Sequence, residues 1–320
     1  MDQRPLQHLP VTLFAAVMGV GGLALAWRRA AKVWGVSEAP FQVLLGAALI
    51  LFVVIGVAYL AKWVRHPAAA RAELRHPIRV AFVPTITISF LVLATALSEV
   101  APEIARVLWW IGGVGHLIAT VAVLSAWFGR PEVGMTQVTP AWFIPIVGNV
   151  ITPLAAPKIG NLDLAWFAFG VGVIFWLALL PLVLQRLLLH DPGLPDKLLP
   201  TLAIFIAPPS VVALSWQALT GELADPVGRI AYAATLMFTL LVLAQVPRLI
   251  RVPFGFPFLA YTFPLAVAAS VAIAMAGAAP GVGYDVIAVA LLALATFVIT
   301  AVIVRVGVAT ARGQLLVPEG

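Results

Sequence analysis

Long apolar segments alternate along the chain with short polar connections. A helix needs about 20 apolar residues to cross the hydrocarbon core of a bilayer, and each of these segments is long enough to span it. The pattern predicts ten transmembrane helices, of which the fifth is broken because four prolines lie within it. The predicted helices lie near residues 9–27, 41–61, 80–98, 105–128, 138–157, 164–184, 198–219, 230–247, 256–277 and 286–304.

The composition indicates one transmembrane domain over residues 1–320. Hydrophobic residues make up 62% of the chain and charged residues 10%, with a mean hydropathy of +1.07, which is more apolar surface than one soluble core encloses. The predicted connections are too short for a second domain, and the absence of cysteine excludes disulfides. The net charge of +6 is spread over these connections, so we expect no nucleic-acid partner.

The basic residues predict an orientation. Connections on the two sides of the predicted bundle hold 13 and 6 Lys and Arg residues, respectively. Short cytoplasmic connections carry the excess of positive charge in membrane proteins. An even number of helices places both termini on the more basic side. We therefore expect a multi-pass protein of the inner (plasma) membrane with both termini in the cytoplasm.

Prolines mark an internal repeat of five helical hairpins. They lie mainly in the odd-numbered predicted helices, with one marker per hairpin at Pro10, Pro84, Pro145, Pro208 and Pro264. A proline frees a backbone carbonyl that only protein or cavity water can satisfy, which favours placing these helices inside. We expect an all-α fold with five odd-numbered, proline-kinked helices in an inner ring around a pore, and five even-numbered helices outside. The alternative is that the prolines only shape packing.

The odd-numbered helices also carry most of the polar side chains expected inside the bundle. A path lined by Thr, Ser, Asn, Gly and Pro would pass ions without holding them tightly. Three glycines near the start of the chain, Gly19, Gly21 and Gly22, are interpreted as sites of close helix packing or as a smooth pore wall. The residues expected to line the pore or to kink its helices are Gly19, Pro84, Thr85, Pro145, Asn149, Pro208, Pro209, Ser210, Thr262 and Pro264.

Candidate residues for catalysis or coupled transport are few. His116 is interpreted as a hydrogen-bonded packing residue and Glu99 as an interfacial carboxylate. The sequence has no metal-ligand spacing, no nucleophile–base pair and no cofactor signature, so we expect no enzyme activity, no metal and no cofactor. A coupled carrier normally needs a buried carboxylate or a cation site, whereas a passive channel needs neither. The pattern therefore favours a channel over a coupled carrier and leaves a uniporter open.

Five segments in order resemble the tellurite-resistance/dicarboxylate transporter family, which includes TehA-type proteins, fungal malate permeases and the slow-type anion channels of plant guard cells. The resemblance runs from about residue 8 to residue 305, and "TPAWFIPIVG" and "AYTFP" are its most specific parts. The five segments are "LPVTLFAAVMGVGGLALAW" (9–27), "ELRHPIRVAFVPTITISFLVLA" (73–94), "TPAWFIPIVGNV" (139–150), "LPTLAIFIAPPSVVALSW" (199–216) and "AYTFPLAVAA" (260–269).

The resemblance implies a homotrimer in which each subunit has its own pore, formed by the five odd-numbered helices. It also implies that Phe263, the Phe of the Thr-Phe-Pro segment, projects into the pore and closes it. Without the resemblance, Phe263 is interpreted as a core aromatic. The implied function is a passive channel for small monovalent anions such as chloride or nitrate, gated by Phe263. The alternatives are transport of C4-dicarboxylates such as malate, or export of tellurite-like oxyanions.

Overall fold

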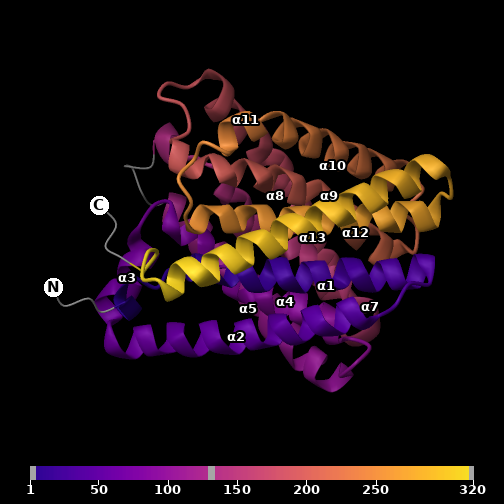
Figure 1. The fold of residues 1–320 in the computed structure, drawn as a ribbon, viewed down its shortest axis with the longest axis horizontal. Coiled ribbons are helices and arrows are strands. Elements are labelled where there is room, and N and C mark those ends of the chain that lie inside the picture. The colour runs from indigo at the N-terminus through magenta and orange to yellow at the C-terminus, as the bar shows by residue number, and fades with distance from the viewer. Residues whose placement is uncertain (1–4, 129–133, 317–320) are drawn as a thin grey trace.

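The computed structural model describes residues 5–128 and 134–316. Helices account for all of the regular structure in this part of the chain, which contains no strand. Most of the long helices run along one axis, and the two ends of the described chain lie at the same end of the bundle (Figure 1). We call this the terminal end, and the other the opposite end. The prediction of an all-helical membrane fold is confirmed.

Nine long helices and four short ones form the bundle, joined by several 3₁₀ segments within the described residues. The long helices are α1 (Phe14–Trp34), α2 (Ala39–Arg65), α4 (Thr85–Leu97), α5 (Pro102–Phe128), α8 (Leu162–Leu189), α9 (Ala207–Thr220), α10 (Pro226–Ala244), α12 (Thr262–Ala278) and α13 (Val282–Ala311). The short ones are α3 (Pro67–Arg75), α6 (Ile144–Val147), α7 (Ala156–Ile159) and α11 (Val246–Leu249). The 3₁₀ segments are η1 (Pro5–His8), η2 (Val11–Leu13), η3 (Arg79–Phe82), η4 (Met135–Gln137), η5 (Pro140–Phe143), η6 (Gly148–Leu154), η7 (Asp196–Ile206) and η8 (Phe256–Tyr261).

Nine helical spans in the described residues are long and apolar enough to cross a membrane. The fifth predicted helix, 138–157, is the exception: it is a chain of short 3₁₀ and α segments whose apolar part runs from Pro140 to Leu154. Several spans extend beyond their predicted windows, and α1 continues to Trp34. Arg28, Arg29 and Lys32, assigned to a connection by the sequence pattern, therefore lie on the last turns of a helix.

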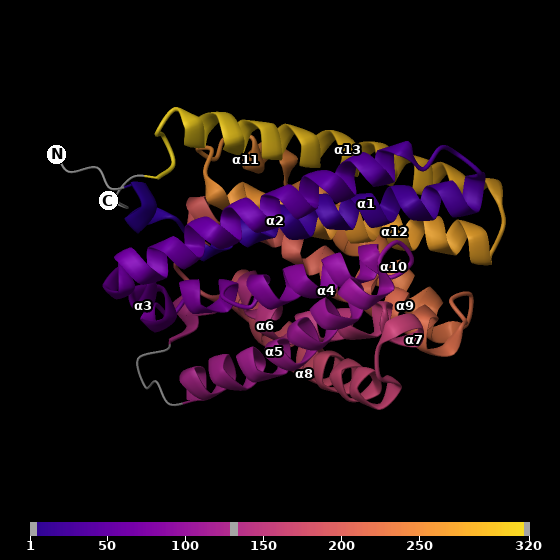
Figure 2. The ribbon, with the colours of Figure 1, turned by 90° about the horizontal axis from the view of Figure 1, so that it is seen from below.

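The contacts between spans follow the predicted hairpins. Within each hairpin the two members pack together, namely α1 with α2, α4 with α5, η6 with α8, α9 with α10, and α12 with α13. The odd-numbered spans also contact one another in sequence, and α12 returns to contact α1. Figure 2 shows α1 beside α12, with α5 and α8 on the far side of the bundle.

Burial separates the odd-numbered spans from the even-numbered ones. In the most apolar part of the four continuous odd-numbered spans, 67 to 89% of the residues are buried, against 22 to 33% in the even-numbered spans. The even-numbered helices carry large exposed apolar side chains such as Ile50, Ile118 and Phe297. Contact of such side chains with lipid is favourable, whereas their exposure to water costs free energy. The even-numbered helices thus form much of the apolar outer surface of the molecule.

The marker prolines of the third, fifth and ninth spans lie where a 3₁₀ segment gives way to an α-helix. Pro84 caps the N-terminus of α4, Pro145 is the second residue of α6, and Pro264 is the third residue of α12. Each follows a 3₁₀ segment that makes up the first part of its span. Proline suits the first turn of an α-helix because its fixed φ is helical and the missing N–H has no partner there. These spans change helix type at proline.

A buried ion pair joins several segments at the terminal end of the bundle. Lys62 of α2 and Glu73 of α3 are 2% and 3% exposed, and Lys62 Nζ lies 3.1 Å from Glu73 Oε1. The Tyr59 hydroxyl donates to Glu73 Oε2 at 2.8 Å, and the Val11 N–H donates to Glu73 Oε1 at 3.3 Å. Lys62 also donates to the Leu9 carbonyl at 2.7 Å. This cluster joins the start of the chain to α2 and α3.

Candidate functional site: a series of three cavities

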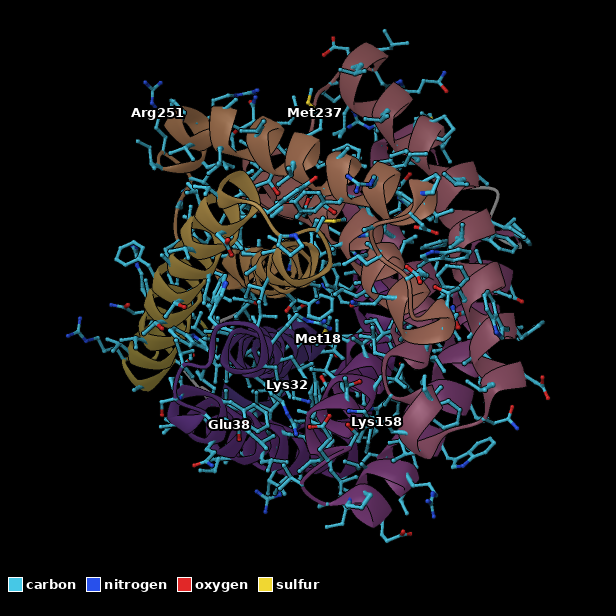
Figure 3. The ribbon with its side chains drawn as sticks, turned by 90° about the vertical axis from the view of Figure 1, so that its right-hand side faces the viewer. Met18, Lys32, Glu38, Lys158, Met237 and Arg251 are labelled. Carbon is cyan, nitrogen blue, oxygen red and sulfur yellow. The ribbon has the colours of Figure 1, made fainter. Side chains whose placement is uncertain are left out.

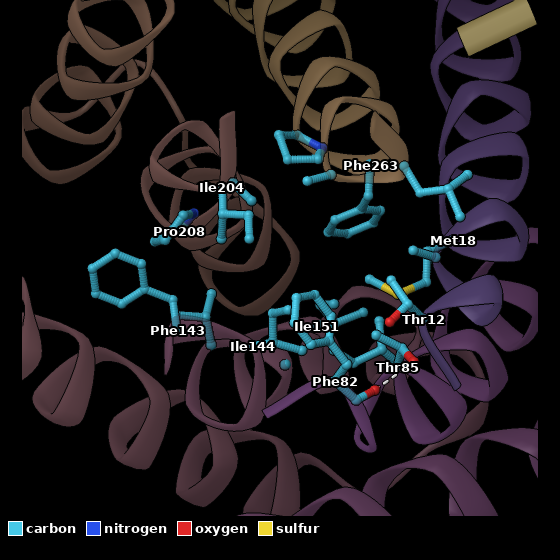
Figure 4. Close-up of a pocket in the computed structure, with 18 of the residues that line it drawn as sticks. Thr12, Met18, Phe82, Thr85, Phe143, Ile144, Ile151, Ile204, Pro208 and Phe263 are labelled. Atoms are coloured by element: carbon cyan, nitrogen blue, oxygen red, sulfur yellow. Dashed lines mark hydrogen bonds between the residues drawn. The ribbon is translucent and has the colours of Figure 1, made fainter. Parts of the chain in front are cut away.

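A small apolar cavity lies at the centre of the bundle, with a volume of about 60 Å³ (Figure 4). All five odd-numbered spans contribute side chains to this central cavity, and Thr12 and Thr85 are its two hydroxyl-bearing lining residues. The Thr85 hydroxyl donates to the Phe82 carbonyl at 2.6 Å, so its polar atom is already engaged. The other lining residues include Met18, Phe82, Ile88, Phe143, Ile144, Val147, Ile151, Ile204, Leu259 and Phe263.

Larger cavities lie on either side of it. A basic vestibule of about 350 Å³ is lined by Arg28, Arg29, Lys32 and Lys158 among others. A terminal vestibule of about 420 Å³ lies near the chain termini. Phe263 lines both the central cavity and the basic vestibule, whereas Thr12, Phe82 and Pro257 line both the central cavity and the terminal vestibule. The three cavities therefore form a series, with an aromatic ring at each junction.

Phe263 is held at its junction by tight packing of α12 on α1. It is the second residue of α12 and 7% exposed. The hydroxyl of Thr262 lies 2.7 Å from the Leu259 carbonyl and 3.2 Å from the Ala15 carbonyl. Gly19 makes this approach possible, because a Cβ at that position would lie 2.3 Å from Thr262 Cβ. These contacts position the backbone beside Phe263, and its ring faces the cavity (Figure 4).

Gly22 leaves room for the ring of Phe263. A Cβ on Gly22 would lie 3.3 Å from Cδ2 of Phe263 and 3.0 Å from Cβ of Ala266. Gly21, its neighbour on α1, faces α4 instead, where an added Cβ would lie 2.8 Å from Val92 Cγ1. The glycines of the first span thus mark close approaches between helices, and Gly22 alone of the three lines the basic vestibule.

The structure brings only part of the predicted pore lining to the central cavity. Of the predicted residues, Thr85, Pro208, Phe263 and Pro264 line it. The others pack between helices in the described structure, and they are Gly19, Pro84, Pro145, Asn149, Pro209, Ser210 and Thr262. The expected polar wall is therefore mostly an apolar one.

The polar side chains are used to satisfy backbone carbonyls within the bundle. Pro153 has no N–H, and in the 3₁₀ geometry of η6 its partner would be the Val150 carbonyl. The Ser215 hydroxyl of α9 donates to that carbonyl instead. The Thr120 hydroxyl of α5 lies 2.5 Å from the Pro145 carbonyl. Such carbonyls are costly without water, and satisfying them keeps hydroxyls out of the cavity.

His116 belongs to the same kind of network. Its ring lies 2.8 Å from the Thr87 hydroxyl, and it is fully buried between α5 and α4. Asn149 donates to the Thr120 hydroxyl at 2.8 Å and to the Ile146 carbonyl at 2.9 Å. A Cβ on Gly148 would lie 2.2 Å from the His116 ring, so this glycine makes room for the imidazole. The contacts agree with the interpretation of His116 as a hydrogen-bonded packing residue.

The basic vestibule assembles charges that are far apart in the sequence. Arg28, Arg29 and Lys32 come from the last turns of α1, and Lys158 comes from α7. Figure 3 looks onto this end of the molecule, where Lys32 and Lys158 are seen. Glu99, in the turn after α4, forms ion pairs with Arg28, Lys32 and Lys158. The sequence pattern placed Glu99 at an interface but gave no sign of this cluster.

The cations are held in different ways. Arg28 Nη1 donates to the Ala96 carbonyl at 3.0 Å, and its guanidinium lies 4.6 Å from the ring centroid of Phe41. Arg29 Nη1 donates to Gln217 Oε1 at 3.0 Å. The pKa of Lys158 lies below its ordinary value, first because of partial burial and then because of the neighbouring cations. The vestibule thus holds four cationic side chains around one carboxylate.

Comparison with known proteins assigns the chain to a family. Residues 8–306 match the family described as voltage-dependent anion channel, which is nearly the whole chain. The chain belongs to this family. The relatives matched within it are named as channels, transporters and a resistance protein. The resemblance inferred from the five sequence segments is confirmed.

Three relatives are 26 to 29% identical to the chain over the residues that align. It is 29% identical over 218 residues to an uncharacterized transporter of Methanocaldococcus jannaschii, MJ0762, with 64% of each chain covered. It is 28% identical over 268 residues to the S-type anion channel SLAH2 of Arabidopsis thaliana, covering 81% of this chain and 51% of the relative. It is 26% identical over 260 residues to the tellurite resistance protein TehA homolog of Haemophilus influenzae, with coverage of 81% and 78%. The chain spans about half to two thirds of the first two relatives.

Proposed function

We propose that the protein is a passive channel for small monovalent anions such as chloride or nitrate, and that Phe263 is its gate. The observation that carries this proposal is the position of Phe263, which lines both the apolar central cavity and the basic vestibule. An anion passing from one to the other must pass its ring. The pore runs along the five odd-numbered spans, whose buried residues surround the three cavities.

The central cavity opposes conduction while the ring of Phe263 is in place. Its volume of about 60 Å³ is far smaller than the volumes of about 350 and 420 Å³ of the two vestibules. An ion that enters must shed its hydration shell, and the apolar side chains around it offer little in return. Narrow hydrophobic constrictions of this kind gate channels by excluding water. Moving the phenyl ring aside would widen the path and let water follow the ion.

The vestibules supply the preference for anions. Four cationic side chains line the basic vestibule with one carboxylate, Glu99. The terminal vestibule is lined by Arg79, Lys197 and His76 together with Glu73. An excess of positive charge at the mouth of a low-dielectric path raises the local concentration of anions. Glu73, a buried carboxylate, is engaged by Lys62 and Tyr59. This pairing favours a structural role for it over a role in proton coupling.

The proposal includes an assembly and an orientation. We expect a homotrimer in the inner (plasma) membrane, with one pore in each subunit and both termini in the cytoplasm. The described chain ends lie at one end of the bundle, as an even number of crossings requires (Figure 1). The terminal vestibule would then face the cytoplasm, and the basic vestibule would face the outside.

The test is the current carried by purified protein in planar bilayers under a chloride or nitrate gradient. Phe263→Ala removes the ring, and the anion conductance is expected to rise at least tenfold over the nearly silent wild type. Phe263→Leu is expected to give an intermediate conductance, because leucine obstructs less of the path. Phe205→Ala is the matched control, since Phe205 is a buried phenylalanine of an odd-numbered span that lies outside the lining of the three cavities.

Two outcomes would contradict the proposal. If correctly assembled Phe263→Ala protein is as silent as the wild type, Phe263 is a packing residue and not the gate. If neither protein carries current while liposomes take up malate slowly and saturably, the protein is a dicarboxylate carrier. Uptake of tellurite in place of malate would indicate an oxyanion transporter.

A further inference from the structure

The carboxylate of Glu99 occupies the middle of the cation cluster in the basic vestibule. Lys32 Nζ lies 2.7 Å from both of its oxygens. Arg28 Nη2 bonds one oxygen, Oε2, and Lys158 Nζ bonds the other, Oε1. The donors come from α1 and α7 and surround a carboxylate that belongs to a third segment. A side chain of the protein thus stands where a dissolved anion would find its strongest contacts.

The cations around Glu99 are not held in position by Glu99 alone. Arg28 is anchored by the Ala96 carbonyl and by the ring of Phe41, and its side chain is 11% exposed. Lys32 and Lys158 are about half exposed, at 49% and 52%, so water can solvate them. Glu99 lies in a turn rather than in a helix, and its side chain is 29% exposed. The carboxylate can therefore leave while a basic pocket remains.

We infer that the basic vestibule is a binding site for small monovalent oxyanions, and that Glu99 is a competitor built into the chain. An incoming anion takes the place of the Glu99 carboxylate between Arg28, Lys32 and Lys158. The exchange leaves the charge of the pocket unchanged, because one negative charge replaces another, and the displaced carboxylate moves into water. Binding is then weak enough for the anion to move on, as conduction requires.

The geometry of the donors selects the chemical class. They are shared between two oxygens of one planar group, with Arg28 on one oxygen and Lys158 on the other. Formate and nitrate present two such oxygens at a similar separation, whereas chloride offers one spherical acceptor. We therefore expect formate and nitrate to bind more tightly than chloride. Charge-assisted bonds of this kind are the stronger ones in proteins.

The binding test uses the thermal stability of the purified protein in detergent, with sodium formate titrated against sodium chloride at constant ionic strength. Glu99→Gln removes the charge of the competitor and leaves Arg28, Lys32 and Lys158 without their carboxylate partner. Its melting temperature is expected to fall in the absence of a binding anion and to recover as formate is added. If Glu99 occupies the site in about nine tenths of wild-type molecules, the apparent affinity for formate is about tenfold tighter in the variant.

Three further variants separate the site from general effects of charge. Glu103→Gln is the matched control, because Glu103 pairs with Arg106 on the exposed face of α5 and lies outside the vestibule lining. It is expected to respond to formate as the wild type does. Glu99→Asp keeps the charge on a shorter side chain and is expected to give an intermediate affinity, which tests the inference if the Gln variant does not fold. Adding Lys158→Gln to Glu99→Gln is expected to weaken formate binding. An equal response to formate in the wild type, Glu99→Gln and Glu103→Gln would overturn the inference.

The inference deepens the proposed function and rests on it for the link to flux, so a second measurement separates the two. In the Phe263→Ala background, Glu99→Gln is expected to lower the formate concentration that gives half-maximal conductance several-fold. If Phe263→Ala carries no current while Glu99→Gln still binds formate, the channel proposal fails and the site stands. If Phe263→Ala conducts but Glu99→Gln changes neither stability nor half-saturation, the site fails and the channel stands.

Discussion

Single residues in this bundle act mainly through close packing, and Gly148 illustrates this at the His116 network. The glycine lies where the chain passes the imidazole, and a Cβ there would be 2.2 Å from the ring and 2.8 Å from Ile88 Cδ1. Both neighbours are buried. The imidazole is also held by its bond to Thr87. The His116 imidazole cannot move away without losing that hydrogen bond, so a side chain at position 148 would overlap with it.

Gly148→Ala is accordingly expected to destabilise the protein by about 1–3 kcal/mol, the usual cost of overpacking. The measurement is the thermal unfolding midpoint of the purified protein. Gly170→Ala is the control, because Gly170 lies within α8 and an added Cβ there would meet nothing within 4 Å. That variant is expected to be neutral or slightly more stable. Equal midpoints for the two variants would refute the packing argument.

At the residue scale the sequence predicted less than it did for the fold. The family resemblance pointed to Phe263, which lines both the central cavity and the basic vestibule, and its role as a gate stays a prediction. Of the predicted lining hydroxyls, Thr85 lines the central cavity, whereas those of Ser210 and Thr262 donate to backbone carbonyls. A sequence pattern cannot tell a hydroxyl that faces a pore from one that satisfies a neighbouring carbonyl. The Glu99 cluster was missed for a different reason: Glu99 is separated by 71 residues from Arg28 and by 59 from Lys158.

At the scale of elements, the Lys62–Glu73 pair holds three segments together at the terminal end. The two side chains are almost fully buried, and the carboxylate also accepts bonds from Tyr59 and from the backbone of Val11. Removing one partner would leave a buried charge without compensation. Such a loss costs far more than the pair itself contributes.

Lys62→Met is therefore expected to destabilise the protein by about 3–5 kcal/mol, because Glu73 stays buried without its cation. Lys62→Met combined with Glu73→Gln removes both charges, and it is expected to recover most of that loss. The thermal unfolding midpoints of the two variants and the wild type measure the difference. A double variant no more stable than Lys62→Met alone would mean that the ion pair is not what joins these elements.

The sequence predicted the positions of the spans well, but it did not predict which part of a span is 3₁₀ and which part is α-helical. Apolar length gave the long spans, because a membrane imposes that length on any helix that crosses it. The prolines indicated a break in each odd-numbered span, but not that the break is a change from 3₁₀ to α-helix. The change from 3₁₀ to α depends on which carbonyls find partners in other segments, as Val150 does with Ser215. Those partners belong to other spans, so the sequence of one span alone does not predict where the change occurs.

At the scale of the whole molecule, the orientation in the membrane can be tested because the chain has no cysteine. Ala72 lies on the exposed side of α3 at the terminal end, and Ser37 is exposed between α1 and α2 at the opposite end. In intact cells, a membrane-impermeant maleimide is expected to label Ser37→Cys and to leave Ala72→Cys unlabelled until the cells are permeabilised. The excess of Lys and Arg on the terminal side is the physical basis. The reverse labelling pattern would place the termini outside.

We expect the 3₁₀ segments of the odd-numbered spans to allow these spans to rotate. An α-helix turns by about 100° per residue and a 3₁₀ helix by about 120°. Each residue that changes from one form to the other therefore turns the rest of its span by about 20°. If the boundary between η8 and α12 moved by two residues, Phe263 would swing by about 40° around the axis of its own helix. If Phe263 is the gate, as we propose, its ring could leave the path by a change in helical pitch, with neither end of the span moving sideways in the membrane.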